Sequence, residues 1–150
     1  MESDNDYYLL LFKKNYLIIN LIFAGLILGI FIYSRAFDPV KNDHPVKCIH
    51  ELLLGTSCPA CGLSRGFSAI VRGDINMARK LQPNSIAVFS FFVVQFFMRI
   101  IGILLIYKVL NYIKLIITLD IILSITLFIF TFQNIISQSM YMFYRYLFNQ

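Results

Sequence analysis

The run YLIINLIFAGLILGIFIYS, residues 16–34, decides the fold class of this chain. Its 19 residues are broken only by Asn20. As an α-helix they would rise about 28 Å, close to the thickness of a bilayer's hydrocarbon core. The run is longer than the apolar part of a typical signal peptide, and no small-x-small cleavage site follows it. We therefore interpret it as an uncleaved membrane anchor.

The composition of the whole chain is that of a membrane protein. Hydrophobic residues make up 59%, the mean hydropathy is +0.73, and only 14% of residues are charged, against about a quarter in soluble domains. The 150 residues leave room for one domain, so we treat 1–150 as a single membrane domain. The net charge of +5 does not indicate nucleic acid, because the basic residues flank apolar spans, where positive charge is a topology signal.

Two further apolar runs are long enough to cross the bilayer, at about 86–107 and 115–132. With 16–34 they predict an all-α integral membrane protein with three transmembrane helices, surrounded by lipid. The remaining tail is apolar over 135–148, which is too short for a confident fourth span. Its tyrosines suit a membrane interface, so the tail is either an interfacial helix or an extension of the third span.

The region between the first and second spans carries the signals of two short helices, 62–72 and 75–81. Gly73 suits the stop of the first helix and Asp74 suits the N-cap of the second. Both helices are amphipathic and too short to span, so we expect them at the membrane interface. Their basic side chains would then face lipid phosphates: Arg65, Arg72, Arg79 and Lys80.

The loop 48–65 holds all three cysteines of the chain, as Cys48 and then Cys58-Pro59-Ala60-Cys61. Cys61 lies just before a predicted helix start, where the helix dipole lowers a thiol pKa, and Arg65 nearby acts in the same direction. A thiolate both binds metals and attacks disulfides. The same residues therefore support a metal hypothesis and a redox hypothesis.

The metal hypothesis is a zinc site. A two-residue spacing between Cys58 and Cys61 is a usual chelating pair, and Cys48 would be a third ligand. A structural zinc site takes four ligands, and the nearest candidates for the fourth are His50 and, further off, His44. Under this hypothesis the protein is a non-enzymatic accessory or interaction module.

Two alternatives remain open. In the first, Cys58 and Cys61 form the dithiol of a membrane thiol-disulfide oxidoreductase, and Cys48 relays electrons to a second partner. No βαβ pattern surrounds the motif, so this would be a helical membrane enzyme and not a thioredoxin. In the second alternative the chain is a purely structural anchor. Beyond the thiols, Arg65 is the candidate for binding an anion, either a thiolate or a lipid phosphate.

The stretch from Cys48 to Asn84 resembles a family of small prokaryotic membrane proteins, domain of unknown function 2752. The family pattern is Cys-Pro-x-Cys-Gly-(Leu/Met)-(Thr/Ser)-Arg, with an earlier Cys and a later Gly-Asp and Asn-Pro. Here the core of the pattern is residues 58–65, and Gln82-Pro83 stands where Asn-Pro is usual. The resemblance implies a small helical membrane protein and no assigned activity.

The distribution of Lys and Arg predicts the orientation. With three spans, the side with the N-terminus and the 108–114 loop has four such residues, and the side with the cysteine loop has eight. By the positive-inside rule the cysteine loop is cytoplasmic, in a multi-pass protein of the inner membrane. Three spans are few for a channel or carrier, so we expect a membrane-protein partner or a homo-oligomer.

Four polar residues lie inside the predicted spans, where they are costly in lipid. Asn20, Arg99 and Asp120 fall toward the same leaflet, opposite the cysteine loop, and Gln95 is nearby. An Arg99–Asp120 pair between antiparallel neighbours would lower the cost of burying both charges. We favour a packing role that fixes helix order over a substrate or proton site, since only one charge of each sign is present.

Overall fold

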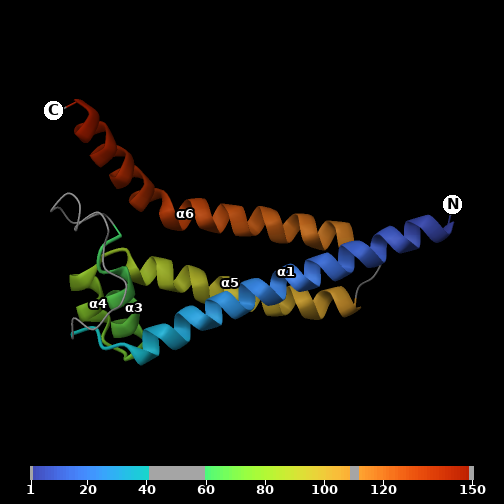
Figure 1. The fold of residues 1–150 in the computed structure, drawn as a ribbon, viewed down its shortest axis with the longest axis horizontal. Coiled ribbons are helices and arrows are strands. Elements are labelled where there is room, and N and C mark those ends of the chain that lie inside the picture. Colours follow the sequence, from blue (N-terminus) through green and yellow to red (C-terminus); the bar gives the residue numbers. More distant parts are fainter. Residues whose placement is uncertain (1, 41–59, 109–111, 149–150) are drawn as a thin grey trace.

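The computed structural model describes residues 2–40, 60–108 and 112–148. This part of the chain is helical and has no strand, which confirms the predicted all-α class. The α-helices are α1 (Glu2–Ala36), α3 (Leu63–Val71), α4 (Ile75–Leu81), α5 (Ser85–Lys108) and α6 (Ile113–Phe148) (Figure 1).

Three of these helices are long and apolar enough to cross a membrane: Leu10–Ala36 of α1, Ser85–Lys108 of α5 and Ile113–Tyr144 of α6. The prediction of three spans is confirmed. The second span matches its expected bounds within a residue, whereas α1 and α6 continue well beyond 16–34 and 115–132. Helix α6 continues past residue 132 because no Gly or Pro occurs between residues 113 and 148 to end it. The tail is therefore continuous in helical structure with the third span.

The three long helices run side by side, with α5 in contact with both α1 and α6 (Figure 1). The short helices α3 and α4 pack together at the end of the bundle where α1 finishes and α5 begins. At the other end, Tyr16, Ile106 and Ile113 form a small buried apolar cluster. Most other large apolar side chains of the long helices face outward, as lipid-facing side chains do.

Helices α5 and α6 form an antiparallel hairpin with one repeating register. Moving four or seven residues toward the N-terminus of α5, about one or two turns, corresponds to moving the same number of residues toward the C-terminus of α6. The facing pairs are Ile106 with Ile113, Arg99 with Asp120, Gln95 with Ser124, and Phe91 with Phe128. The register brings a charged pair, a polar pair and an aromatic pair together in successive layers.

The turn between α3 and α4 has the geometry that the sequence predicts. Gly73 has a φ of 84°, and its N–H donates to the Ile70 carbonyl at 2.9 Å while the Asp74 N–H donates to the Ala69 carbonyl at 3.0 Å. These two bonds are the Schellman motif of a helix C-terminus. The Asp74 side chain then accepts from the Met77 N–H at 2.9 Å and caps α4.

The apolar side of α3 contacts protein. Phe67 is buried, with its ring 5.4 Å from that of Phe89 and 5.9 Å from that of Phe92 on α5. Gly66 lies so close to α5 that a Cβ atom there would come within 2.7 Å of the Ser85 Cβ. The side of α3 that carries Gly66 and Phe67 thus packs on α5, and the short helices are an integral layer of the fold.

Candidate functional site

Two regions of the structure hold the candidate functional side chains, and the first is the start of α3. Cys61 directly precedes Gly62, the N-cap residue, which has a φ of 85° and adopts the left-handed conformation. The Leu63 N–H donates to the Ala60 carbonyl at 3.2 Å, and the Gly66 N–H donates to the Gly62 carbonyl at 2.8 Å. The predicted position of Cys61 at a helix N-terminus is confirmed.

The backbone beside Cys61 is held by the far end of α4. A Cβ atom at Gly62 would lie 2.7 Å from the carbonyl oxygen of Leu81, closer than real Cβ contacts. Only glycine combines the positive φ with this close approach. The start of α3 and the end of α4 therefore lock each other, and the half-buried Cys61 is carried on a defined turn.

The other proposed ligands lie outside the described residues: Cys48, Cys58, His50 and His44. Within 2–40, 60–108 and 112–148, no three His, Cys, Asp or Glu side chains gather closely enough to hold a metal ion. Two residues of the predicted thiol site, Cys61 and Arg65, are thus placed by the structure. Arg65 is half-buried in the first turn of α3.

The basic side chains at the ends of α3 and α4 differ in their surroundings. The Arg72 guanidinium donates through Nη1 to the Phe37 carbonyl at 2.8 Å, which ties the end of α3 to the end of α1. Arg79 and Lys80, in the last turn of α4, are exposed. The expectation that all of these side chains face phosphates is thus modified for Arg72, because one of its donors is used on the backbone.

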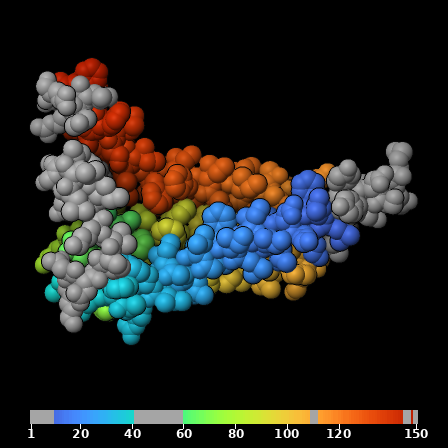
Figure 2. All heavy atoms as spheres, viewed as in Figure 1, coloured from blue at the N-terminus to red at the C-terminus, as the bar shows by residue number. Residues whose placement is uncertain are grey.

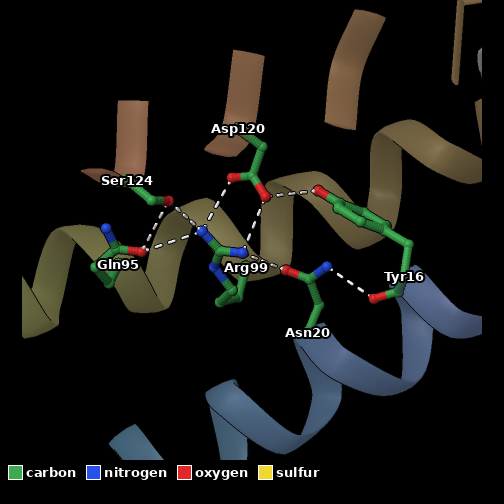
Figure 3. A network of polar contacts seen from close by, with 6 residues as sticks. All are labelled: Tyr16, Asn20, Gln95, Arg99, Asp120 and Ser124. Carbon is green, nitrogen blue, oxygen red and sulfur yellow. Dashed lines mark hydrogen bonds and ion pairs between the residues drawn. The ribbon is translucent and has the colours of Figure 1, made fainter. Parts of the chain in front are cut away.

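The second place is a polar network inside the bundle, centred on Arg99 (Figure 3). Arg99 and Asp120 make a two-pronged ion pair, with Nη1 2.9 Å from Oδ2 and Nη2 3.0 Å from Oδ1. Both side chains are only 11% exposed. The predicted pairing of α5 and α6 through these residues is confirmed. Paired hydrogen bonds of this kind fix orientation as well as distance.

Three further side chains contact the guanidinium of Arg99. Nη1 also donates to the Asn20 side-chain oxygen at 2.9 Å, and Nη2 lies 3.1 Å from the Gln95 oxygen and 2.6 Å from the Ser124 hydroxyl. Asn20 is fully buried and returns its own N–H₂ to the Tyr16 carbonyl at 2.8 Å. All three long helices therefore contribute to one arginine.

Tyr16 reaches this network by crossing α5. Its hydroxyl donates to Asp120 Oδ2 at 3.0 Å, so Asp120 accepts from both α1 and α5. The crossing point is Gly102, where an added Cβ would lie 2.6 Å from the Tyr16 hydroxyl oxygen. A glycine at this position is what lets a side chain of α1 contact α6.

The sequence analysis missed Tyr16 and Ser124 as members of the network. A signal was available, because each long helix contributes two residues four positions apart: Tyr16 and Asn20, Gln95 and Arg99, Asp120 and Ser124. Residues at this spacing share one helix face. A polar residue four positions from an intramembrane charge is therefore a candidate partner of that charge.

The network is neutral and almost fully paired. In the described part of the chain, one buried side-chain N or O atom has no hydrogen-bond partner, the Gln95 Nε2. The ion pair lies about 10–14 Å along the helices from the 108–113 connection, at a depth where lone charges are costly. Such a network can fix the rotation of each long helix about its axis and the order of the three helices in the bundle. The presence of one charge of each sign fits this packing role.

Comparison with known families identifies one match. The family described as Protein of unknown function (DUF2752) matches residues 48–96, which is 49 of the 150 residues. The match confirms the resemblance inferred from the sequence. It covers the cysteine loop, α3, α4 and the first half of α5, and it ends before Arg99. Searches of curated proteins and of solved structures found no match.

Proposed function

We propose that this multi-pass membrane protein is an accessory or interaction module whose cysteine loop binds zinc. Cys48, Cys58 and Cys61 are the thiolate ligands, and His50 is the fourth. The observation that carries the proposal is the fixed turn at Cys61, where Gly62 is locked against the Leu81 carbonyl. A structural zinc site benefits from a ligand whose backbone is already held before the metal binds.

The chemistry of the turn supports metal binding in a second way. The first N–H groups of α3 have no carbonyl partners within the helix, and the positive end of the helix dipole points toward Cys61. Half-buried Arg65 adds a nearby positive charge. Both favour the thiolate form, which is the form that coordinates zinc.

The interior of the bundle supports an accessory role and not a transport role. Its one described ion pair is neutral and holds α5 to α6, with Asn20 and Tyr16 bringing in α1. This interior is suited to carrying the cysteine end rigidly at the membrane surface. The partner is then a second membrane protein or a second copy of this chain.

We place the protein in the inner membrane with the cysteine loop in the cytoplasm, on the basis of the eight-to-four distribution of Lys and Arg. The C-terminus would be on the same side. Fusion of a fluorescent protein to the C-terminus should give fluorescence, and fusion of alkaline phosphatase should give no activity. The reverse pair of results would contradict this orientation.

The zinc proposal is tested by metal content and thiol count on protein purified anaerobically in detergent. We expect about one zinc per chain in the wild type and its loss in Cys61→Ser. Ser64→Ala is the matched control, since it removes a hydroxyl from the first turn of α3 and leaves every thiol in place. Absence of metal from the wild type would contradict the proposal.

The same measurement separates the alternatives. A metal-free protein with a reducible Cys58–Cys61 disulfide would favour the membrane thiol-disulfide oxidoreductase. A metal-free protein with three unreactive thiols would leave the structural anchor. The mass of the protein–detergent complex, compared between wild type and Cys61→Ser, then shows whether an oligomer depends on the metal.

A further inference from the structure

Helix α6 is longer than the helix it packs against. The register of the α5–α6 hairpin pairs Phe91 with Phe128, and the Phe91 ring also lies 5.5 Å from that of Phe132. One further step of four would bring position 87 of α5 opposite Phe132, close to the start of α5 at Ser85. Residues 135–148, here called the C-terminal arm, therefore extend past the end of α5.

The C-terminal arm lies at the same end of the bundle as α3, α4 and Cys61, because α5 begins there. It is the red segment in Figure 1, and it bends away from α5 instead of continuing along the bundle. Figure 2 shows it as a projection that leaves the three packed long helices. Its 14 residues are about 21 Å long. A helix that bends in this way turns from the direction of the spans toward the plane of the membrane.

The arm is amphipathic. Ile136, Met140 and Phe143 fall on one stripe at helical spacing and are 48%, 64% and 61% exposed. Gln138 falls on the opposite side and is also exposed, as is Asn134 just before the arm. The apolar stripe thus has no cover from the described part of this chain.

Two observations bear on what covers this stripe. At the same helical spacing it continues the exposed residues Ile122, Ile125 and Ile129 of the span, which face lipid. In addition, the α6 side chains of the polar layers against α5, Asp120 and Ser124, lie on the other side of the helix, while Phe132, which contacts Phe91, lies at the edge of the stripe. A bend away from α5 therefore turns the lipid-facing stripe down onto the bilayer.

We propose that the C-terminal arm lies in the membrane–water boundary as an interfacial helix, with Ile136, Met140 and Phe143 inserted between the lipids at the cysteine end of the protein. The exposed Tyr141 and Tyr144 on its flanks are residue types enriched at this depth. Amphipathic helices of this kind insert their apolar side a short way below the headgroups. The arm would keep the cysteine end close to the lipid surface, whether or not the loop binds a metal.

The experiment uses the absence of tryptophan from the chain. Phe143→Trp on the apolar stripe and Gln138→Trp on the polar side each introduce a single fluorophore at an exposed position, where substitutions are well tolerated. The full-length variants are reconstituted in phosphatidylcholine–phosphatidylglycerol vesicles. Quenching by lipids brominated high on the acyl chain is compared with quenching by aqueous acrylamide. Ile129→Trp provides the reference for a residue within the span.

We expect a blue-shifted emission and strong bromolipid quenching for Phe143→Trp, with a red-shifted emission and strong acrylamide quenching for Gln138→Trp. Ile129→Trp should be quenched by bromine placed deeper on the chain. Equal acrylamide quenching of the two arm variants would overturn the proposal, because the arm would then project into water. Protection of Phe143→Trp from both quenchers would also overturn it, because a protein surface would then cover the stripe.

Discussion

The Tyr16 hydroxyl donates a 3.0 Å hydrogen bond to Asp120 across a sequence separation of 104 residues, and it passes over Gly102 to do so. This contact links the first span to the third beside the buried apolar cluster of Tyr16, Ile106 and Ile113. It also gives Asp120 a second donor besides Arg99. The small residue on the middle helix is therefore as important to the network as the polar residues themselves.

Gly102→Ala should destabilise the protein, because the new Cβ would lie 2.6 Å from the Tyr16 hydroxyl and displace it from Asp120. Overpacking of this kind costs about 1–3 kcal/mol. The measurement is the unfolding free energy in detergent micelles. Gly25→Ala is the control, because nothing lies within 4 Å of a Cβ atom there. Equal stability of the two variants would refute a role for Gly102 as the crossing point.

Asp120→Asn should cost about 3–5 kcal/mol, because it leaves the Arg99 charge buried without its counter-ion. The double variant Arg99→Met/Asp120→Leu should be markedly more stable than Asp120→Asn, since it removes both charges from the span. Chemical unfolding of the single and double variants measures the coupling. Thr126→Val is a control on the same helix, at an exposed hydroxyl. A double variant no more stable than the single would show that the two residues act independently.

Gly62→Ala should be more damaging than Gly73→Ala, although both glycines have a φ near +85°. The left-handed conformation costs a non-glycine residue about 1–2 kcal/mol at either site. At Gly62 the new Cβ would also meet the Leu81 carbonyl, whereas nothing lies within 4 Å at Gly73. Protease sensitivity of the α3–α4 region and the reactivity of the Cys61 thiol report the difference. If both variants behave alike, the contact between Gly62 and α4 does not hold the turn.

Asp74→Ala should lower the stability of α4 by about 1 kcal/mol, because it removes the acceptor of the Met77 N–H. Asp74→Asn keeps an acceptor at the same place and should retain most of the stability. Hydrogen exchange of the α4 amides measures the effect locally. Asn76→Ala, at an exposed position in the same turn, is the control. Faster exchange in Asn76→Ala than in Asp74→Ala would contradict the capping role.

The sequence by itself determined the helices, their order and the turn between α3 and α4. Apolar runs of sufficient length specify spans, and the signals at Gly73 and Asp74 act within one or two helical turns, so they can be recognised without knowing the rest of the fold. The Arg99–Asp120 pair was also predictable, because depth in the membrane follows from position along each span and lone charges there must find partners.

Only the tertiary structure decided how each helix is rotated about its axis. That rotation brings Tyr16 over Gly102, places Ser124 beside Arg99 and turns the apolar side of α3 onto α5. The physical reason is that rotation is set by close packing among side chains from distant segments, and the hydropathy of an apolar helix is nearly the same on all sides. The length of α6 beyond its span follows from its uninterrupted helix-forming sequence, but its bend away from α5 is a property of the packed molecule.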